Sequence, residues 1–210
     1  MITLAEVMGV MRAMKNLPGK RLAMLFEGGL VVLASGLVVV LAWWPGWHLW
    51  QLIWPTWQAV PVAVLSGVLA TVPLVGGYLL LVRLTWAPLV RLRRETVRVA
   101  NLLLGDASTW ELAVVSTLAG VGEEMLFRGV IQPVAVCLTT PLMGLLVASL
   151  LFGLAHCLTW LYFSFATLIG FYFGALALLC GEIVTPAVAH GLYDFVVLVH
   201  VLKLARRLPT

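Results

Sequence analysis

Two adjacent glutamates, Glu123 and Glu124, and an arginine four residues further on, Arg128, lie within an otherwise apolar stretch of the sequence. Each ionisable group at that depth in a membrane costs about 2.5 kcal/mol or more. Residues four apart lie on one face of a helix, so Arg128 can pair with Glu124. Glu123 is turned by about 100° from its neighbour and need not share the arginine. The three residues together indicate a functional site in which Glu123 is the free carboxylate.

Two further pairs with the same four-residue spacing follow: Phe152 with His156, and His190 with Asp194. The spacing predicts that Phe152 packs beside His156 and that Asp194 hydrogen-bonds to His190. A free carboxylate can act as a general base toward water, and histidines can position a water molecule or donate to a developing oxyanion. Such a set can attack a carbonyl carbon with activated water, which in a membrane means cleaving a peptide bond.

The composition is that of a membrane protein. Of the 210 residues, 62% are hydrophobic and 10% are charged, and the mean hydropathy is +1.07. Soluble domains are about half apolar and a quarter charged. With about 20 residues per span, the chain accommodates an all-α polytopic membrane protein with about six transmembrane helices in one bundle. The three cysteines lack metal-ligand spacing and are interpreted as packing residues without a disulfide framework.

The apolar stretches predict where the spans lie. They place them at about 22–44, 59–82 and 109–132, with two more between 141 and 181 and the last from Glu182 to about 202. The third span is expected to stop at Pro133, because proline interrupts helices. Glu27, near the start of the first span, is interpreted as a carboxylate that reaches the interface or pairs with Arg21.

The charges predict the orientation. Lys and Arg cluster before the first span, between the second and third, and after the last, whereas residues 43–57 hold six of the nine tryptophans and no Lys or Arg. Positive flanks are cytoplasmic and tryptophans favour the interface, so both termini are predicted in the cytoplasm of a multi-pass cell (inner) membrane protein. The basic clusters serve this topology and anionic lipid contact, and no nucleic-acid partner is expected.

The same reasoning divides the chain into four parts. These are an amphipathic cytoplasmic N-terminus (1–21), two N-terminal transmembrane helices with a basic cytoplasmic loop (22–108), a four-helix catalytic core (109–203) and a basic cytoplasmic tail (204–210). At about 1.5 Å per residue, Glu123 and His190 lie at similar depth nearer the outer face, and His156 lies nearer the cytoplasm. The helices are therefore expected to be staggered or broken, with Pro186 kinking the last one.

The three patterns, in this order on successive late spans, resemble the CAAX-protease and bacteriocin-processing (CPBP, Abi) family of intramembrane glutamic endopeptidases. The resemblance rests on the double glutamate with arginine four beyond, the Phe-x-x-x-His and the His-x-x-x-Asp, and it covers about 109–200. It implies that Glu123 activates water with help from His156, supported by Glu124 and Arg128. It further implies that His190 and residue 194 line the oxyanion site. Residue 194 is Asp where many members have Asn, and an ionised Asp cannot donate to an oxyanion.

Two alternatives remain open. Glu123, His156 and His190 could bind zinc and leave a coordination position for water, although the sequence lacks a His-Glu-x-x-His pattern, so the metal-free, cofactor-free mechanism is favoured. Buried Glu, His and Arg are also typical of proton-coupled transporters, but no inverted repeat is apparent. The favoured interpretation is an intramembrane endopeptidase acting on a membrane-anchored peptide or protein.

Overall fold

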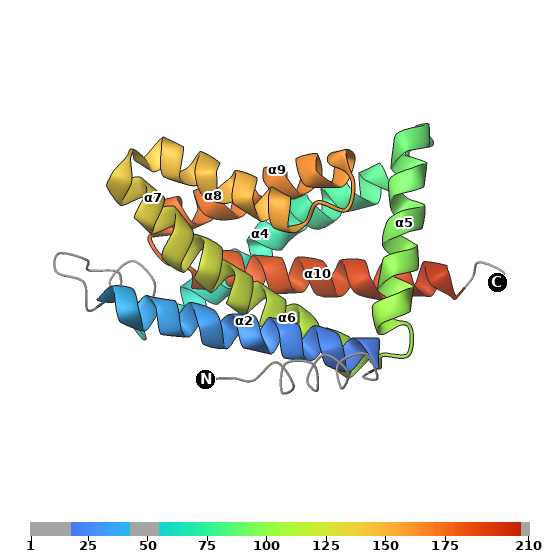
Figure 1. The fold of residues 1–210 in the computed structure, drawn as a ribbon, viewed down its shortest axis with the longest axis horizontal. Helices are drawn as coiled ribbons and strands as arrows, with labels where there is room; N and C mark the ends of the chain where they lie inside the picture. The colour runs from blue at the N-terminus through green and yellow to red at the C-terminus, as the bar shows by residue number, and fades with distance from the viewer. Residues whose placement is uncertain (1–17, 43–54, 207–210) are drawn as a thin grey trace, which may run out of the picture.

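The computed structural model describes residues 18–42 and 55–206, and over these ranges the chain is helical without strands (Figure 1). The elements are α2 (Gly19–Ala42), α4 (Val60–Leu81), α5 (Ala87–Leu104), α6 (Thr109–Leu126), the π-helical turn η1 (Phe127–Ile131), α7 (Gln132–Leu138), α8 (Pro141–Ala155), α9 (Trp160–Cys180) and α10 (Val184–Ala205). The predicted all-α membrane protein is therefore confirmed. The predicted amphipathic helix and most of the tryptophan-rich segment lie outside the described residues, as do 207–210 of the predicted tail, whereas 204–205 belong to α10.

Within the described residues, four helices, α2, α4, α9 and α10, are long and apolar enough to cross a membrane. The prediction of six spans in one bundle is not confirmed. Helix α6 carries three carboxylates, and α8 has 15 residues, so that it extends only about 22 Å against a hydrocarbon core of about 30 Å. The glutamate pair therefore lies on a helix that is unlike an ordinary membrane span, and His156 directly follows another such helix, α8.

The predicted stop at Pro133 is wrong. The chain continues from α6 through η1 into α7 and ends at Leu138. In η1 the N–H of Gln132 donates to the carbonyl of Phe127, five residues back, and Pro133 follows in the first turn of α7. A π-helical turn shifts the hydrogen-bond register by one residue, which lets the chain pass a residue that lacks an N–H.

The predicted basic loop before residue 109 is largely a helix, α5. Its buried residues Val97, Ala100 and Leu104 recur at helical spacing and pack against Val201 and Leu202 of α10. Its exposed face carries the arginines at positions 91, 94 and 98. The loop prediction rested on charge alone and overlooked this apolar periodicity.

Helix α10 lies at the centre of the fold and packs against α6, α4, α5 and α9 (Figure 1). Glycine lets α6 and α10 touch: a Cβ atom on Gly120 would lie 2.7 Å from the Ala187 carbonyl oxygen. The Glu182 carboxylate accepts backbone N–H groups at the start of α10, where Pro186 occupies the first turn. N–H groups of a first turn have no intrahelical acceptor, so Pro186 removes no helical hydrogen bond, and the expected kink has no cause there.

Helix α2 runs beside α6 (Figure 1). Lys20, at the start of α2, lies 3.1 Å from the carboxylate of Glu111, which also forms a capping box with Ser108 at the start of α6. Further along, Ala34 and Val38 of α2 pack with apolar residues of α6 and η1. These contacts fix the register of α2 along the helix that carries the glutamate pair.

Candidate active site

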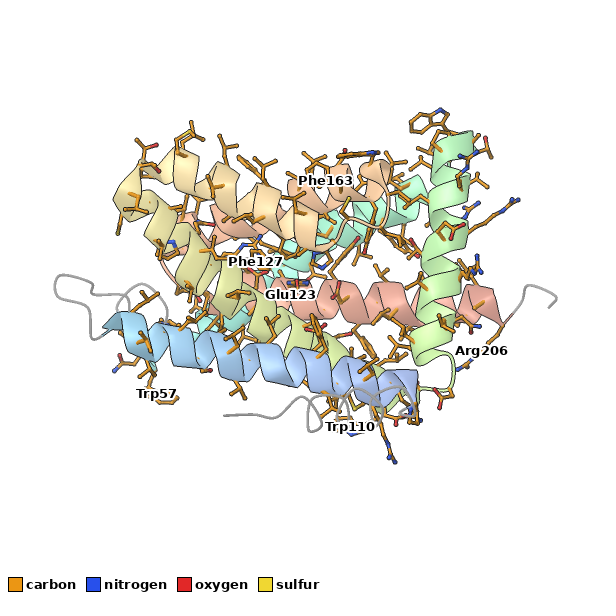
Figure 2. All side chains as sticks on the ribbon, in the orientation of Figure 1. Trp57, Trp110, Glu123, Phe127, Phe163 and Arg206 are labelled. Carbon is orange, nitrogen blue, oxygen red and sulfur yellow. The ribbon has the colours of Figure 1, made fainter. Side chains whose placement is uncertain are left out.

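The two glutamates are buried at the end of α6 and find different partners. Figure 2 shows Glu123 and Phe127 in the interior, whereas Trp57 and Trp110 project from the outer edge. Glu124 is completely buried, and its Oε1 accepts hydrogen bonds from Arg128 Nη1 and His190 Nδ1, each at 2.9 Å. Glu123 Oε2 lies 3.4 Å from His156 Nε2. As predicted, Arg128 binds Glu124, and Glu123 has a different partner.

Arg128 lies in a closed aromatic and carbonyl cage. Its Nη2 donates to the Gly170 carbonyl at 2.6 Å, and its guanidinium carbon lies 5.7, 4.7 and 5.6 Å from the ring centres of Phe127, Phe152 and Phe173. Aromatic faces attract cations, most strongly where water is excluded. The cage holds the guanidinium against Glu124 and links η1 to α9.

A second donor repeats this link one turn later. Gln132 Nε2 donates to the Gly174 carbonyl at 3.1 Å. Glu124, Arg128 and Gln132 are spaced by four residues, as are the accepting Gly170 and Gly174. Bare glycines leave room there: a Cβ atom on Gly174 would lie 2.6 Å from Gln132 Oε1. Gly170 and Gly174 thus leave their carbonyl groups accessible to side-chain donors from the neighbouring helix.

His156 caps the end of the short helix α8. Its ring stacks on Phe152 at 4.5 Å between centroids, as predicted, and its Nδ1 lies 2.9 Å from the Phe152 carbonyl oxygen. A carbonyl only accepts hydrogen bonds, so Nδ1 carries the proton and Nε2 faces Glu123. Because α8 ends at Ala155, His156 reaches the depth of Glu123, and the predicted depth difference is absent.

His190 is buried between two carboxylates. Its Nδ1 contacts Glu124, and its Nε2 lies 3.4 Å from Asp194 Oδ2, one turn further along α10. The ring of Phe173 stacks on the imidazole with centroids 4.8 Å apart. Both ring nitrogens therefore have carboxylate partners, and the ring plane is fixed by aromatic packing. Arg128, Glu124, His190 and Asp194 form one continuous polar chain.

A cavity of about 490 Å³ opens beside these residues and is bordered by α4, α5, α8, α9 and α10. His156, His190 and Asp194 line it together with many apolar side chains. Glu123 is not part of this lining and lies directly behind His156. An apolar ligand or an extended peptide in the cavity would meet the two histidines from one side.

Several residues of the site were not identified from the sequence. Phe173 gives no signal, because an aromatic residue in an apolar helix is ordinary. Gln132 could have been found by extending the four-residue spacing of Glu124 and Arg128. Glu27 was expected to reach the interface or to pair with Arg21, which is exposed, and no ion pair joins the two residues in the described part of the chain.

Within residues 18–42 and 55–206, no three His, Cys, Asp or Glu side chains are arranged to hold a metal ion. The cysteines Cys137, Cys157 and Cys180 are unpaired and exposed, so the packing role predicted for them is not one in the core.

The sequence comparison agrees with the motifs. Residues 105–196 match the family model described as Type II CAAX prenyl endopeptidase Rce1-like. No curated protein and no solved structure matched the chain. The matched segment contains all three motifs and leaves α2 and α4 outside.

The helical fold and the matched segment define a multi-pass membrane protease. The resemblance noted from the motifs is confirmed, and residues 105–196 carry the domain of the CAAX-protease family.

Proposed function

We propose that the protein is an intramembrane glutamic-type endopeptidase that hydrolyses a peptide bond of a membrane-anchored protein or peptide. The observation that carries the proposal is the Glu123–His156 contact beside a cavity that His190 and Asp194 also line. The Glu123 carboxylate with the His156 imidazole can serve as the base for water, and the His190 imidazole can donate a hydrogen bond to the oxyanion of the same reacting carbonyl.

The proposed reaction needs no covalent intermediate. Glu123, aided by His156, takes a proton from water, whose oxygen attacks the carbonyl carbon. The oxyanion that forms accepts a hydrogen bond from His190 Nε2, whose single N–H it shares with Asp194 at 3.4 Å, while Glu124 holds the ring through Nδ1. When the C–N bond breaks, the proton held by Glu123 passes to the leaving amine, so that base and acid are the same carboxyl group.

The remaining residues support this set. Arg128 keeps Glu124 paired, which leaves Glu123 free of the guanidinium. Phe152 lies between the His156 ring and the Arg128 guanidinium and thus holds both in place. The site as proposed uses no cofactor.

Purified protein in liposomes with a membrane-anchored peptide tests the proposal. Cleavage that persists after chelation supports the metal-free mechanism. Cleavage that chelators abolish and zinc restores would instead favour a zinc enzyme that uses Glu123, His156 and His190. Proton movement without cleavage would favour a proton-coupled transporter.

Exchanges at Asp194 distinguish two roles for this residue. If a protonated Asp194 donates to the oxyanion, Asp194→Asn keeps most activity and Asp194→Ala loses about a hundredfold. If Asp194 only orients His190, both variants lose activity to a similar degree. The contact of 3.4 Å between Asp194 and His190 Nε2 favours the orienting role. Cleavage rates of the three proteins decide, and wild-type activity in Asp194→Ala would exclude both roles.

We further propose that both termini lie in the cytoplasm of a cell (inner) membrane. A variant lacking the three native cysteines, with a single cysteine introduced by Arg94→Cys or Trp57→Cys, tests this orientation. An impermeant thiol reagent is expected to label position 57 from outside and position 94 only after the cytoplasmic side is exposed. External labelling of position 94 would reverse the orientation.

A further inference from the structure

A third carboxylate lies close to the glutamate pair. Glu27 is the ninth residue of α2, about 12 Å along the helix from its start. Its Oε2 is buried and has no hydrogen-bond partner within the described residues. A buried polar atom without a partner is rare in proteins and costs about 1–3 kcal/mol, so its presence requires a reason.

The packing of α2 on α6 brings the backbone of α2 at Glu27 next to the site. A Cβ atom on Gly122 would lie 3.2 Å from the Val31 nitrogen and 3.4 Å from the Glu27 carbonyl oxygen. The backbone of α2 therefore touches α6 at the residue next to Glu123. The titratable groups close enough to act on the Glu27 carboxyl are Glu123, Asp194, His190 and His156.

Glu123 has a comparable atom. Its Oε2 is also buried, and it lies 3.4 Å from His156 Nε2 without accepting a hydrogen bond from that atom or from any other described residue. Two ionised carboxylates both accept and cannot satisfy each other, whereas one water molecule has two O–H groups and can donate to both. Buried waters typically occupy positions between polar groups that otherwise lack partners.

We propose that Glu27 is a second acidic residue of the active site, which holds and orients the water molecule that Glu123 deprotonates. This rests on the proposed function and extends it to α2, which lies outside the matched segment 105–196. Glu27 accepts one hydrogen of the water, the other hydrogen passes to Glu123, and the oxygen lone pair is directed at the substrate carbonyl. Helix α2 thereby supplies part of the site.

The test compares Glu27→Gln and Glu27→Asp, with Phe26→Leu as the control. Phe26 is the neighbouring residue of α2 and is 67% exposed, so its exchange is expected to leave cleavage unchanged. Glutamine keeps the size of Glu27 but loses the carboxylate, and kcat is expected to fall about tenfold or more. KM is expected to stay within about twofold, because Glu27 does not line the cavity. Aspartate keeps the carboxylate and is expected to be more active than glutamine.

The order of the two variants separates the water-holding role from a structural one. If only the shape of Glu27 mattered, glutamine would be more active than aspartate, and this order would overturn the proposal, as would wild-type kcat in Glu27→Gln. Glu123→Gln is measured in the same preparations. An inactive Glu123→Gln beside a fully active Glu27→Gln rejects the role of Glu27 alone, whereas full activity in Glu123→Gln rejects the proposed function itself.

Discussion

Replacing Arg128 by methionine is expected to lower the free energy of unfolding by about 3–5 kcal/mol, because it leaves the Glu124 carboxylate buried without its cation. Arg128 and Glu124 are both inaccessible to solvent, so neither can recover the lost interaction with water. The exchange also removes the donor to the Gly170 carbonyl. It further removes the guanidinium that lies among the rings of Phe127, Phe152 and Phe173. Unfolding in detergent, followed by the loss of helical circular dichroism, measures the effect.

Arg94→Met is the matched control for this exchange. Arg94 lies on the exposed face of α5, and its replacement is expected to change stability by less than about 0.5 kcal/mol. Arg128→Lys should lie between the two, because lysine keeps the charge but lacks the second donor that reaches α9. Equal stability of the Arg128→Met and Arg94→Met proteins would show that the buried ion pair does not hold the site together.

Replacing Glu123 by glutamine is expected to lower kcat about 10²–10⁴-fold, the usual contribution of a general base. Glutamine has nearly the same size and still fits beside His156, but it cannot take a proton from water. KM is expected to change little, since Glu123 lies behind the histidine that lines the cavity. The rate of cleavage of a membrane-anchored peptide under single-turnover conditions measures the chemical step directly.

Two further variants define what the loss in Glu123→Gln means. Asp106→Asn removes a carboxylate whose side chain is 66% exposed, and it is expected to leave the rate unchanged. The cleavage rate of His156→Ala should be lower than that of the wild type as well. The double variant with Glu123→Gln and His156→Ala should be little slower than either single variant, because the effects of residues that act as a unit do not add. A double variant that loses the full product of both factors would argue against a shared water.

The contacts that the sequence predicted correctly are local. The pair Glu124–Arg128 and the stacking of His156 on Phe152 both follow from the spacing of four residues on one helix. The contacts that assemble the site are tertiary, such as Glu123 with His156 and Glu124 with His190. They depend on where α8 ends and on the π-helical turn after α6, and neither feature has a pattern in the sequence.

The position of Glu27 illustrates the same limit. A carboxylate eight residues after the start of a span can reach the interface or face a neighbour, depending on which side of the helix packs. The contact between Gly122 and the backbone of α2 places Glu27 beside α6, and it joins residues nearly a hundred positions apart. The prediction of six spans is not confirmed for a related reason: a stretch that is apolar enough was assumed to be long enough, whereas α8 has 15 residues and ends just before His156.

The most direct test of the account is peptide cleavage by metal-stripped wild-type protein and metal-stripped Glu123→Gln in the same liposomes. The wild type is expected to cleave the membrane-anchored peptide at an unchanged rate after chelation, and Glu123→Gln is expected to be slower by about 10²–10⁴-fold. Cleavage by Glu123→Gln at the wild-type rate would contradict the central claim that this carboxylate activates the attacking water.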